Sequence, residues 1–447
     1  MKRAFNILIC VVSAIILIGC EELPAEHTAL PTSPASTPLR AHATLQEKPS
    51  TKEPTGEMTL REALSLALTR SPQLKAFSWE ARVAEAMQLQ AGLRPNPELG
   101  VEVEEVGGSG PRSRFDAAEA SISLSQLIEL GDKRHKRMAL ARAQSQLAGW
   151  DYEAARLDVL AGVSRVFVEV LAAQRKLQLA EELLDVSGRM ADAVARRVDA
   201  GKDSPVARSR AEIAHSQMQI THEKAKQNLY LAKVRLVSFW DGAEPQFTAA
   251  VGDLDSVGDI PTLADLFALL DNNPDLARWA AEIESRQKAL AYERAKSVQD
   301  VTVGAGMQHF GEGDDNAVMF GLSIPIGVSD RNQGGKQAAA HNLAKAGQLS
   351  RAAYIRVRQQ LAKAYQNLSN AHIEATTLKQ DMLPSAESVF EASQEGYEEG
   401  KLDYLNLLDG QRTLFEVRSQ HIEALVAFQH AKVDVERLIG RKLESIE

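Results

Sequence analysis

The chain has 447 residues and a formal net charge of −9, with its 51 basic and 60 acidic side chains interspersed. The absence of a basic stripe argues against nucleic acid as a partner. Aromatic residues make up only 5% of the chain, and Ala, Leu, Gln, Glu and Arg are abundant, which favours long helices packed on small residues over a thick globular core.

The N-terminus has the pattern of a secretory signal. Two basic residues precede an apolar run over residues 4–18, which is too short for a comfortable membrane span. The run ends in Leu-Ile-Gly-Cys at Cys20, which resembles the bacterial lipobox. The resemblance implies that residues 1–19 are a lipoprotein signal peptide and that Cys20 carries a lipid, palmitate included; the alternative is a signal anchor with a chance cysteine. Glu21 after the cysteine favours, by analogy, sorting to the outer membrane.

Processing of this kind also determines the cysteine chemistry. Cleavage removes Cys10 and acylation uses Cys20, the two cysteines of the chain. The mature protein is then expected to have no disulfide, no catalytic cysteine and no cysteine-based zinc site.

The rest of the chain is predicted to be a tether followed by two copies of one unit. Residues 20–56 are rich in Pro, Thr, Ser and Ala and poor in large apolar side chains, which predicts a flexible, lipid-anchored tether. The repeats are expected over 57–242 and 262–442, with an inter-repeat linker at 243–261 and a tail at 443–447. The matching landmarks are Thr59 and Thr262, Ser71-Pro72 and Asn273-Pro274, Gly201 and Gly400, and Gly242 and Gly440.

Each repeat contains two short segments of alternating polarity. They lie at about 98–106 and 119–128 in the first repeat and at about 300–310 and 317–326 in the second. Their length of about ten residues is that of a tilted transmembrane strand. The alternative is a pair of half-buried hairpins in a soluble domain.

Four such strands cannot close a barrel, and an open sheet edge is not tolerated in lipid. Three copies of the chain would supply an even-numbered, twelve-stranded barrel with an aqueous lumen. The sequence therefore predicts a homotrimer in contact with outer-membrane lipid. The alternation places Val and Ile toward lipid and the side chains of Glu102 and Glu104 toward the lumen.

Long helices follow the strand pairs. No proline interrupts residues 133–199, and apolar residues recur there at heptad-like spacing, which predicts a helix of roughly 100 Å. The second repeat matches it over 332–397, with a kink expected at Leu383-Pro384. The helices then turn back at Gly201 and Gly400. The predicted fold class is mainly α with transmembrane β: duplicated long helical hairpins forming an α-barrel, with four strands per protomer completing the β-barrel.

This duplicated unit, over about residues 57–442, resembles the TolC-like outer-membrane efflux family. The most specific match is Tyr397-x-x-Gly400 with the segment from Leu405 to Arg412, which is similar to the Tyr-x-x-Gly…Leu-Asp pattern of the family's periplasmic entrance. Pro325 and the segment 330–334 resemble the branch that exports cobalt, zinc and cadmium. The resemblance implies a passive, trimeric outer-membrane duct for divalent heavy metals, working with a periplasmic adaptor and an inner-membrane resistance-nodulation-division pump.

The resemblance also implies an entrance gate. Asp409 matches a position where three symmetry-related carboxylates form a cation-attracting ring. Asn406 stands where a second acidic ring can occur, Leu402 stands where a gate Arg can sit, and Tyr397 is expected to contribute a hydrogen bond. The alternative for each is a solvated helix-end side chain. The residues expected at the hairpin tips, in contact with the adaptor, are Gly201, Lys202, Gly400, Lys401 and Asp403.

The sequence contains no catalytic constellation and predicts neither an enzyme nor a cofactor. Motifs of the GxSxG, P-loop, GxGxxG, HExxH and CxxC types are absent. His215 and His222 lie seven apart on one predicted helix face without a convincing ligand set, so no metal site is expected. Three alternatives remain: a duct for drugs or other organic compounds, a periplasmic adaptor, and a lipid-anchored helical enzyme or binding protein.

Overall fold

The computed structural model describes residues 54–113, 117–270 and 273–443. The predicted signal peptide, Cys20, most of the tether and most of the tail lie outside the described residues. Within those ranges, no helix combines the length and the hydropathy that a membrane-spanning helix needs.

The two repeats fold into matching series of elements. The first consists of β1 (Glu57–Thr59), α2 (Leu60–Arg70), α3 (Pro72–Gly92), β2 (Glu98–Glu104), β3 (Glu119–Ile128), α4 (Lys133–Asp199) and α5 (Pro205–Val237). After β4 (Ala249–Val251), the second consists of α6 (Leu263–Ala268), α7 (Pro274–Ala295), β5 (Val301–Phe310), β6 (Asp315–Ser323), α8 (Gln333–Thr377), α9 (Leu383–Glu398) and α10 (Tyr404–Ile439).

The starts of equivalent helices use the same local chemistry. Thr59 and Thr262 each close a capping box, in which the threonine side chain accepts from a backbone N–H and an acidic side chain three residues on accepts in return. Ser71 and Asn273 each cap a helix that begins with proline, whose missing N–H is no loss at that position. The duplication read from the sequence is therefore repeated in the backbone.

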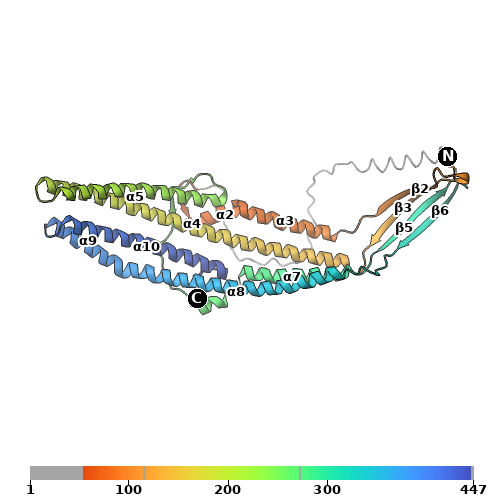
Figure 1. Ribbon diagram of the computed structural model, residues 1–447. Coiled ribbons are helices and arrows are strands. Elements are labelled where there is room, and N and C mark those ends of the chain that lie inside the picture. Colours follow the sequence, from red (N-terminus) through yellow and green to blue (C-terminus); the bar gives the residue numbers. More distant parts are fainter. Residues whose placement is uncertain (1–53, 114–116, 271–272, 444–447) are drawn as a thin grey trace. The chain divides into compact units, whose positions relative to one another are not determined.

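The long helices follow the predicted course. α4 is a single helix of 67 residues, about 100 Å long. Its counterpart is interrupted, as expected near Leu383-Pro384, because five residues, Leu378–Met382, adopt a π-helix between α8 and α9. Pro384 lacks an N–H, and the wider turn before it accommodates the lost hydrogen bond. Figure 1 shows the strands at one end of α4 and α8, and at the opposite end the turns from α4 into α5 and from α9 into α10.

The four larger strands form one antiparallel sheet in the order β2-β3-β5-β6. Four predicted strand ends differ from those in the structure. β2 ends at Glu104 instead of 106, because Glu105 takes a left-handed conformation with φ 58°. β5 begins at Val301 because the carboxylate of Asp300 accepts from Leu130 N instead. β6 spans Asp315–Ser323 instead of 317–326, and Pro325, which cannot donate to a ladder, lies just beyond it.

Two apolar cores lie where short elements cover the long helices. In the first repeat, Met58 of β1, Leu66 of α2 and Phe167 of α4 are buried together with Trp240. In the second repeat, Leu266 of α6 packs with Leu361 of α8 and neighbouring residues of α10. Burial of such side chains contributes about 1.5–3 kcal/mol each. These cores fix the middle of each helical layer and leave the sheet and the hairpin turns at its ends.

Candidate functional site

The four-stranded sheet has two chemically different faces. Residues that face each other across an antiparallel ladder project to the same side, so the register sorts every side chain. One face is apolar over most of its area and strongly exposed; Phe320, for example, is 84% exposed. Its larger apolar members are Leu99, Val101, Val103, Ile122, Leu124, Ile128, Val301, Val303, Met307, Val318, Phe320 and Leu322; Ala120, Gln126, Ala305, His309 and Asn316 lie on the same face.

The opposite face is polar, and all of its charged side chains are carboxylates. Glu102 pairs with Ser121 and Glu104 with Glu119, so the two predicted glutamates lie on this face, and both are exposed. The other acidic members are Glu98, Glu119 and Asp315; Gly, Ser, Thr and Gln fill most of the remaining positions. Sequence reasoning missed these three because they become neighbours only once the strand register is known.

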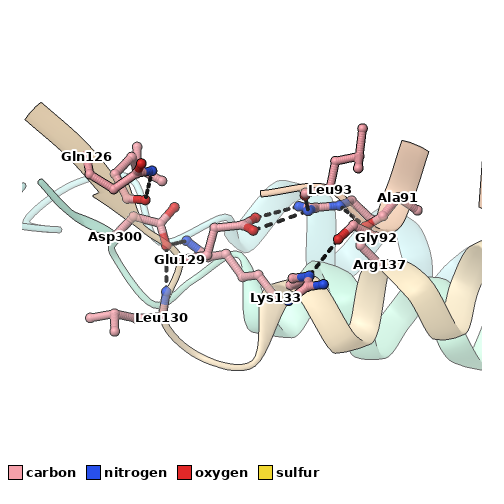
Figure 2. A network of polar contacts seen from close by, with 11 residues as sticks. Ala91, Gly92, Leu93, Gln126, Glu129, Leu130, Lys133, Arg137 and Asp300 are labelled. Atoms are coloured by element: carbon pink, nitrogen blue, oxygen red, sulfur yellow. Dashed lines mark hydrogen bonds and ion pairs between the residues drawn. The ribbon is translucent and has the colours of Figure 1, made fainter. Parts of the chain in front are cut away.

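A polar network joins this sheet to the helices (Figure 2). Arg137 near the start of α4 pairs with Glu129 at the end of β3 and also donates to the carbonyls of Ala91 and Leu93, 2.8 and 2.9 Å away. Its hydrogen bond to Glu129 raises the pKa of Arg137. Lys133 forms an ion pair of 2.7 Å with Asp300.

The tight turn between β3 and α4 depends on a glycine. Gly131 has φ 68°, and a Cβ there would lie 2.7 Å from the side chain of Val298. Any other residue would therefore be strained and would collide with the segment before β5. The turn and the polar network together hold the sheet in one orientation on the helical layer.

At the other end, the two hairpin tips are tied to each other. The Tyr397 hydroxyl of α9 donates to Asp203 Oδ2 at 2.9 Å, and Arg197 Nε of α4 donates to the same oxygen at 2.7 Å. The Arg197 guanidinium also lies 4.6 Å from the centroid of the Tyr397 ring. Burial, with Asp203 adding to it, raises the pKa of Tyr397, so its hydroxyl stays protonated and remains a donor. The sequence did not predict a role for Asp203.

The other predicted tip residues have simpler surroundings. Asp403 caps α10 by accepting from Asn406 N at 3.1 Å, and Asn406 Nδ2 donates to the same carboxylate at 2.7 Å. Asp409 is exposed, and its side chain forms no hydrogen bond or ion pair in the described part of the chain. Gly201 and Gly400 end their hairpin helices with φ 69° and 76°; the adjoining Lys202 and Lys401 are exposed. The gate and adaptor roles of these residues stay predictions.

The two histidines noted in the sequence, His215 and His222, lie beside other polar side chains. His215 Nδ1 lies 3.1 Å from Ser187 Oγ, and His222 lies 3.8 Å from Glu181 and 3.6 Å from Glu223. Among the residues that the structure describes, no three His, Cys, Asp or Glu side chains are placed to share a metal ion.

The burial of one histidine, His421, should make the stability of the fold depend on pH. Nε2 of His421 on α10 is buried without a hydrogen-bond partner among the described residues. Burial lowers the pKa of His421; nearby Asp255 opposes this shift and Lys379 adds to it. The unfolded chain then binds a proton at higher pH than the folded one, so the stability that neutral His421 contributes is fully present above about pH 6.5 and is lost as pH falls below it.

We expect His421→Met to flatten this pH dependence, measured as the midpoint of thermal unfolding between about pH 7.5 and 5, the range that brackets the ordinary histidine pKa. His341→Gln, at an exposed position of α8, is the control and should keep the wild-type slope. Equal slopes for the wild type and His421→Met would show that this histidine does not carry the effect.

The duplicated helical hairpins, the two-faced sheet and the linked tips define a channel-type membrane protein rather than an enzyme fold. The sequence pattern of the family described as "Outer membrane efflux protein" matches residues 63–242 and 267–441. The chain belongs to this family, whose members are passive TolC-like ducts.

Two similar proteins illustrate the relationship. The chain is 36% identical over 390 residues to the cobalt-zinc-cadmium resistance protein CzcC of Cupriavidus metallidurans, covering 87% of this chain and 92% of that one. The CmeC outer membrane channel of Campylobacter jejuni shares the fold, with a TM-score of 0.72 and 15% identity over 87% of both chains. The predicted fold class and family are thus confirmed.

Proposed function

We propose that this protein is the outer-membrane duct of a three-part efflux system and that its cargo is divalent heavy-metal cations. TolC-like channels are trimers that work with periplasmic adaptors and inner-membrane resistance-nodulation-division pumps. In the proposal, the pump supplies the energy and selects the cargo. This chain supplies a water-filled path, and the lipid on Cys20 anchors its N-terminus in the outer membrane.

The observation that carries the proposal is the two-faced sheet. Within the described part of the chain, its edge strands β2 and β6 each have one unpaired side, and three copies can pair them into a closed twelve-stranded wall. The face with Phe320 and Val318 then meets lipid, and the face with Glu102 and Glu104 meets water. A lumen whose strand-borne charges are all carboxylates attracts cations and repels anions.

Two further features support divalent metal cargo. CzcC, by its name, confers resistance to cobalt, zinc and cadmium, and it matches this chain over most of its length. At the hairpin tips, exposed Asp409 would become three carboxylates around the trimer axis. A duct for organic compounds is the second candidate, and growth of a deletion strain in metal salts and in lipophilic drugs distinguishes the two.

The tip contact fits an entrance that can be held closed. Tyr397 belongs to the second hairpin and Asp203 to the first, so their hydrogen bond links the two hairpins of one protomer. We propose that Tyr397, with Asn406 and Asp409 nearby on α10, belongs to this gate. The exposed side chains of Lys202 and Lys401 at the turns are proposed to meet the adaptor.

Ion selectivity in planar lipid bilayers tests the acidic lumen. The triple variant Glu102→Gln, Glu104→Gln, Glu119→Gln removes nine carboxylates from a trimer, and we expect the cation-to-anion permeability ratio to fall several-fold. Glu284→Gln on α7, an exposed carboxylate away from the sheet, is the control and should leave the ratio unchanged. If the triple variant kept the wild-type permeability ratio, the acidic face would not line the conduction path.

A further inference from the structure

The side of α3 that faces away from the rest of the chain is apolar. Among the described elements, α7 packs along both α4 and α8, whereas its counterpart α3 packs lengthwise only on α4. The free side of α3 exposes Trp79 and Val83, which are 62% and 56% exposed. Large apolar side chains this exposed on one helix face indicate a surface that another element covers.

The internal repeat identifies what that element is. Ser71 corresponds to Asn273 at the caps of α3 and α7, and Asp132 corresponds to Asn332 before α4 and α8, with φ of 62° and 55°. Counting from these caps, Trp79 and Val83 of α3 correspond to Ala281 and Ser285 of α7. Both of these α7 residues are buried. The exposed side of α3 is therefore the counterpart of the side that α7 uses to pack inside the chain.

The α4–α7 seam has a defined register. Arg278 of α7 pairs with Asp151 of α4, and Lys133 at the start of α4 pairs with Asp300 just after α7, so the helices run antiparallel. Ala281 lies one turn beyond Arg278. In an antiparallel pair this places it opposite Leu147, one turn before Asp151. A small residue on α7 thus faces a large one on α4.

At the corresponding positions of α3 and α8 the sizes are reversed: the large residue is on α3 and the small one on α8. Trp79 takes the place of Ala281, and Gly347 takes the place of Leu147. A Cβ added at Gly347 would meet nothing within 4 Å, so the surface of α8 is open at this point. A large residue on α3 is complementary to a glycine on α8 in the same register.

The charges on α3 and α8 are also complementary in this register. α8 carries no Asp or Glu between Gln333 and Ile373, and within the described residues none of its cations in that stretch forms an ion pair. Arg351 occupies the position of Asp151. Glu80, exposed on α3, lies one turn from the residue that corresponds to Arg278. The cations of this stretch are Lys336, Lys345, Arg351, Arg356, Arg358 and Lys363.

We propose that α3 of one copy packs on α8 of the next in the register of the internal α7–α4 seam, with Trp79 over Gly347 and Glu80 within reach of Arg351. The occupant of the exposed α3 face is thus a second copy of this chain. The inference rests on the proposed trimer and adds the residues and the register of its seam.

A size-exchange experiment on the full chain in detergent tests the register. Trp79→Ala and Gly347→Leu should each raise, by about tenfold or more, the protein concentration at which half of the trimer dissociates. The double variant restores the Ala–Leu pair of the internal seam and should recover most of the loss. The control double variant combines Trp79→Ala with Gly149→Leu, at an exposed glycine of α4 that also has open space around it, and should show no recovery.

Disulfide trapping gives a second readout that does not depend on stability. Trp79→Cys with Gly347→Cys should form bonds between copies under mild oxidation, whereas Trp79→Cys with Arg358→Cys, about 16 Å further along α8, should not. If the wild type is a trimer but the double variant shows no size compensation and the first cysteine pair is not trapped, this seam alone is overturned. A monomeric wild-type protein would overturn both the seam and the trimeric duct.

Discussion

Tyr397→Phe and Asp203→Asn are expected to shift the entrance toward open states, with larger single-channel conductance in planar bilayers. Tyr397→Phe removes the hydroxyl that donates to Asp203 at 2.9 Å. Hydrogen bonds to charged groups contribute about 1.5–3 kcal/mol, so one such link changes an open–closed equilibrium roughly 10- to 100-fold. Asp203→Asn weakens this bond and also the ion pair with Arg197, and its effect should be the larger.

Tyr230→Phe provides the control, because Tyr230 is an exposed tyrosine on α5, away from the tip. It should leave the conductance at the wild-type value. Wild-type conductance in Asp203→Asn, measured on protein that inserts normally, would mean that the tip contact does not hold the entrance closed.

Arg437→Met is expected to lower the free energy of unfolding by about 2–3 kcal/mol. Arg437 of α10 donates to Asp158 of α4 at 2.7 Å and to Asp275 of α7 at 3.0 Å, so it joins three helices from both repeats. Burial by itself lowers the pKa of Arg437, but the bonds to the two carboxylates outweigh it and raise the pKa. The variant leaves the two carboxylates close together without their cation. They are 58% and 35% exposed, so solvent screening puts the cost below the roughly 3–5 kcal/mol expected for a fully buried pair.

Denaturant unfolding in detergent measures this cost. Arg189→Met breaks an exposed pair with Asp185 and is the control, with an expected loss below about 0.5 kcal/mol. Arg437→Met combined with Asp158→Asn and Asp275→Asn should recover part of the stability, because the repelling charges are gone. Similar losses for Arg437→Met and Arg189→Met would show that Arg437 does not bind the repeats together.

The sequence predicted features that depend on local chemistry. α4 begins and ends at the predicted residues because a proline-free apolar stripe and Gly201 determine its extent. The break before Pro384 follows from the missing N–H of proline, although its form as a π-helix does not. Period-two alternation predicted all four strands of the large sheet. It did not predict all of their ends, because these depend on the conformation of Glu105 and on the contact between Asp300 and Leu130.

The candidate site was less predictable because its contacts join distant parts of the chain. Asp203 meets Tyr397 from the other repeat, and nothing near Asp203 in the sequence marks that contact. Glu119 lies beside Glu104 only through the register of β2 and β3. The seam proposed for Trp79 and Gly347 became visible only when the buried α7 positions could be compared with the exposed α3 positions.

Growth of a deletion strain, with and without the gene restored, tests the proposed function most directly. The panel is zinc, cobalt, cadmium, nickel, copper and silver salts together with lipophilic drugs. We expect the deletion to sensitise cells to some of the divalent metals and not to the drugs, and the restored gene to reverse the defect. Sensitivity to the drugs alone would contradict the metal cargo and would leave a duct for organic compounds.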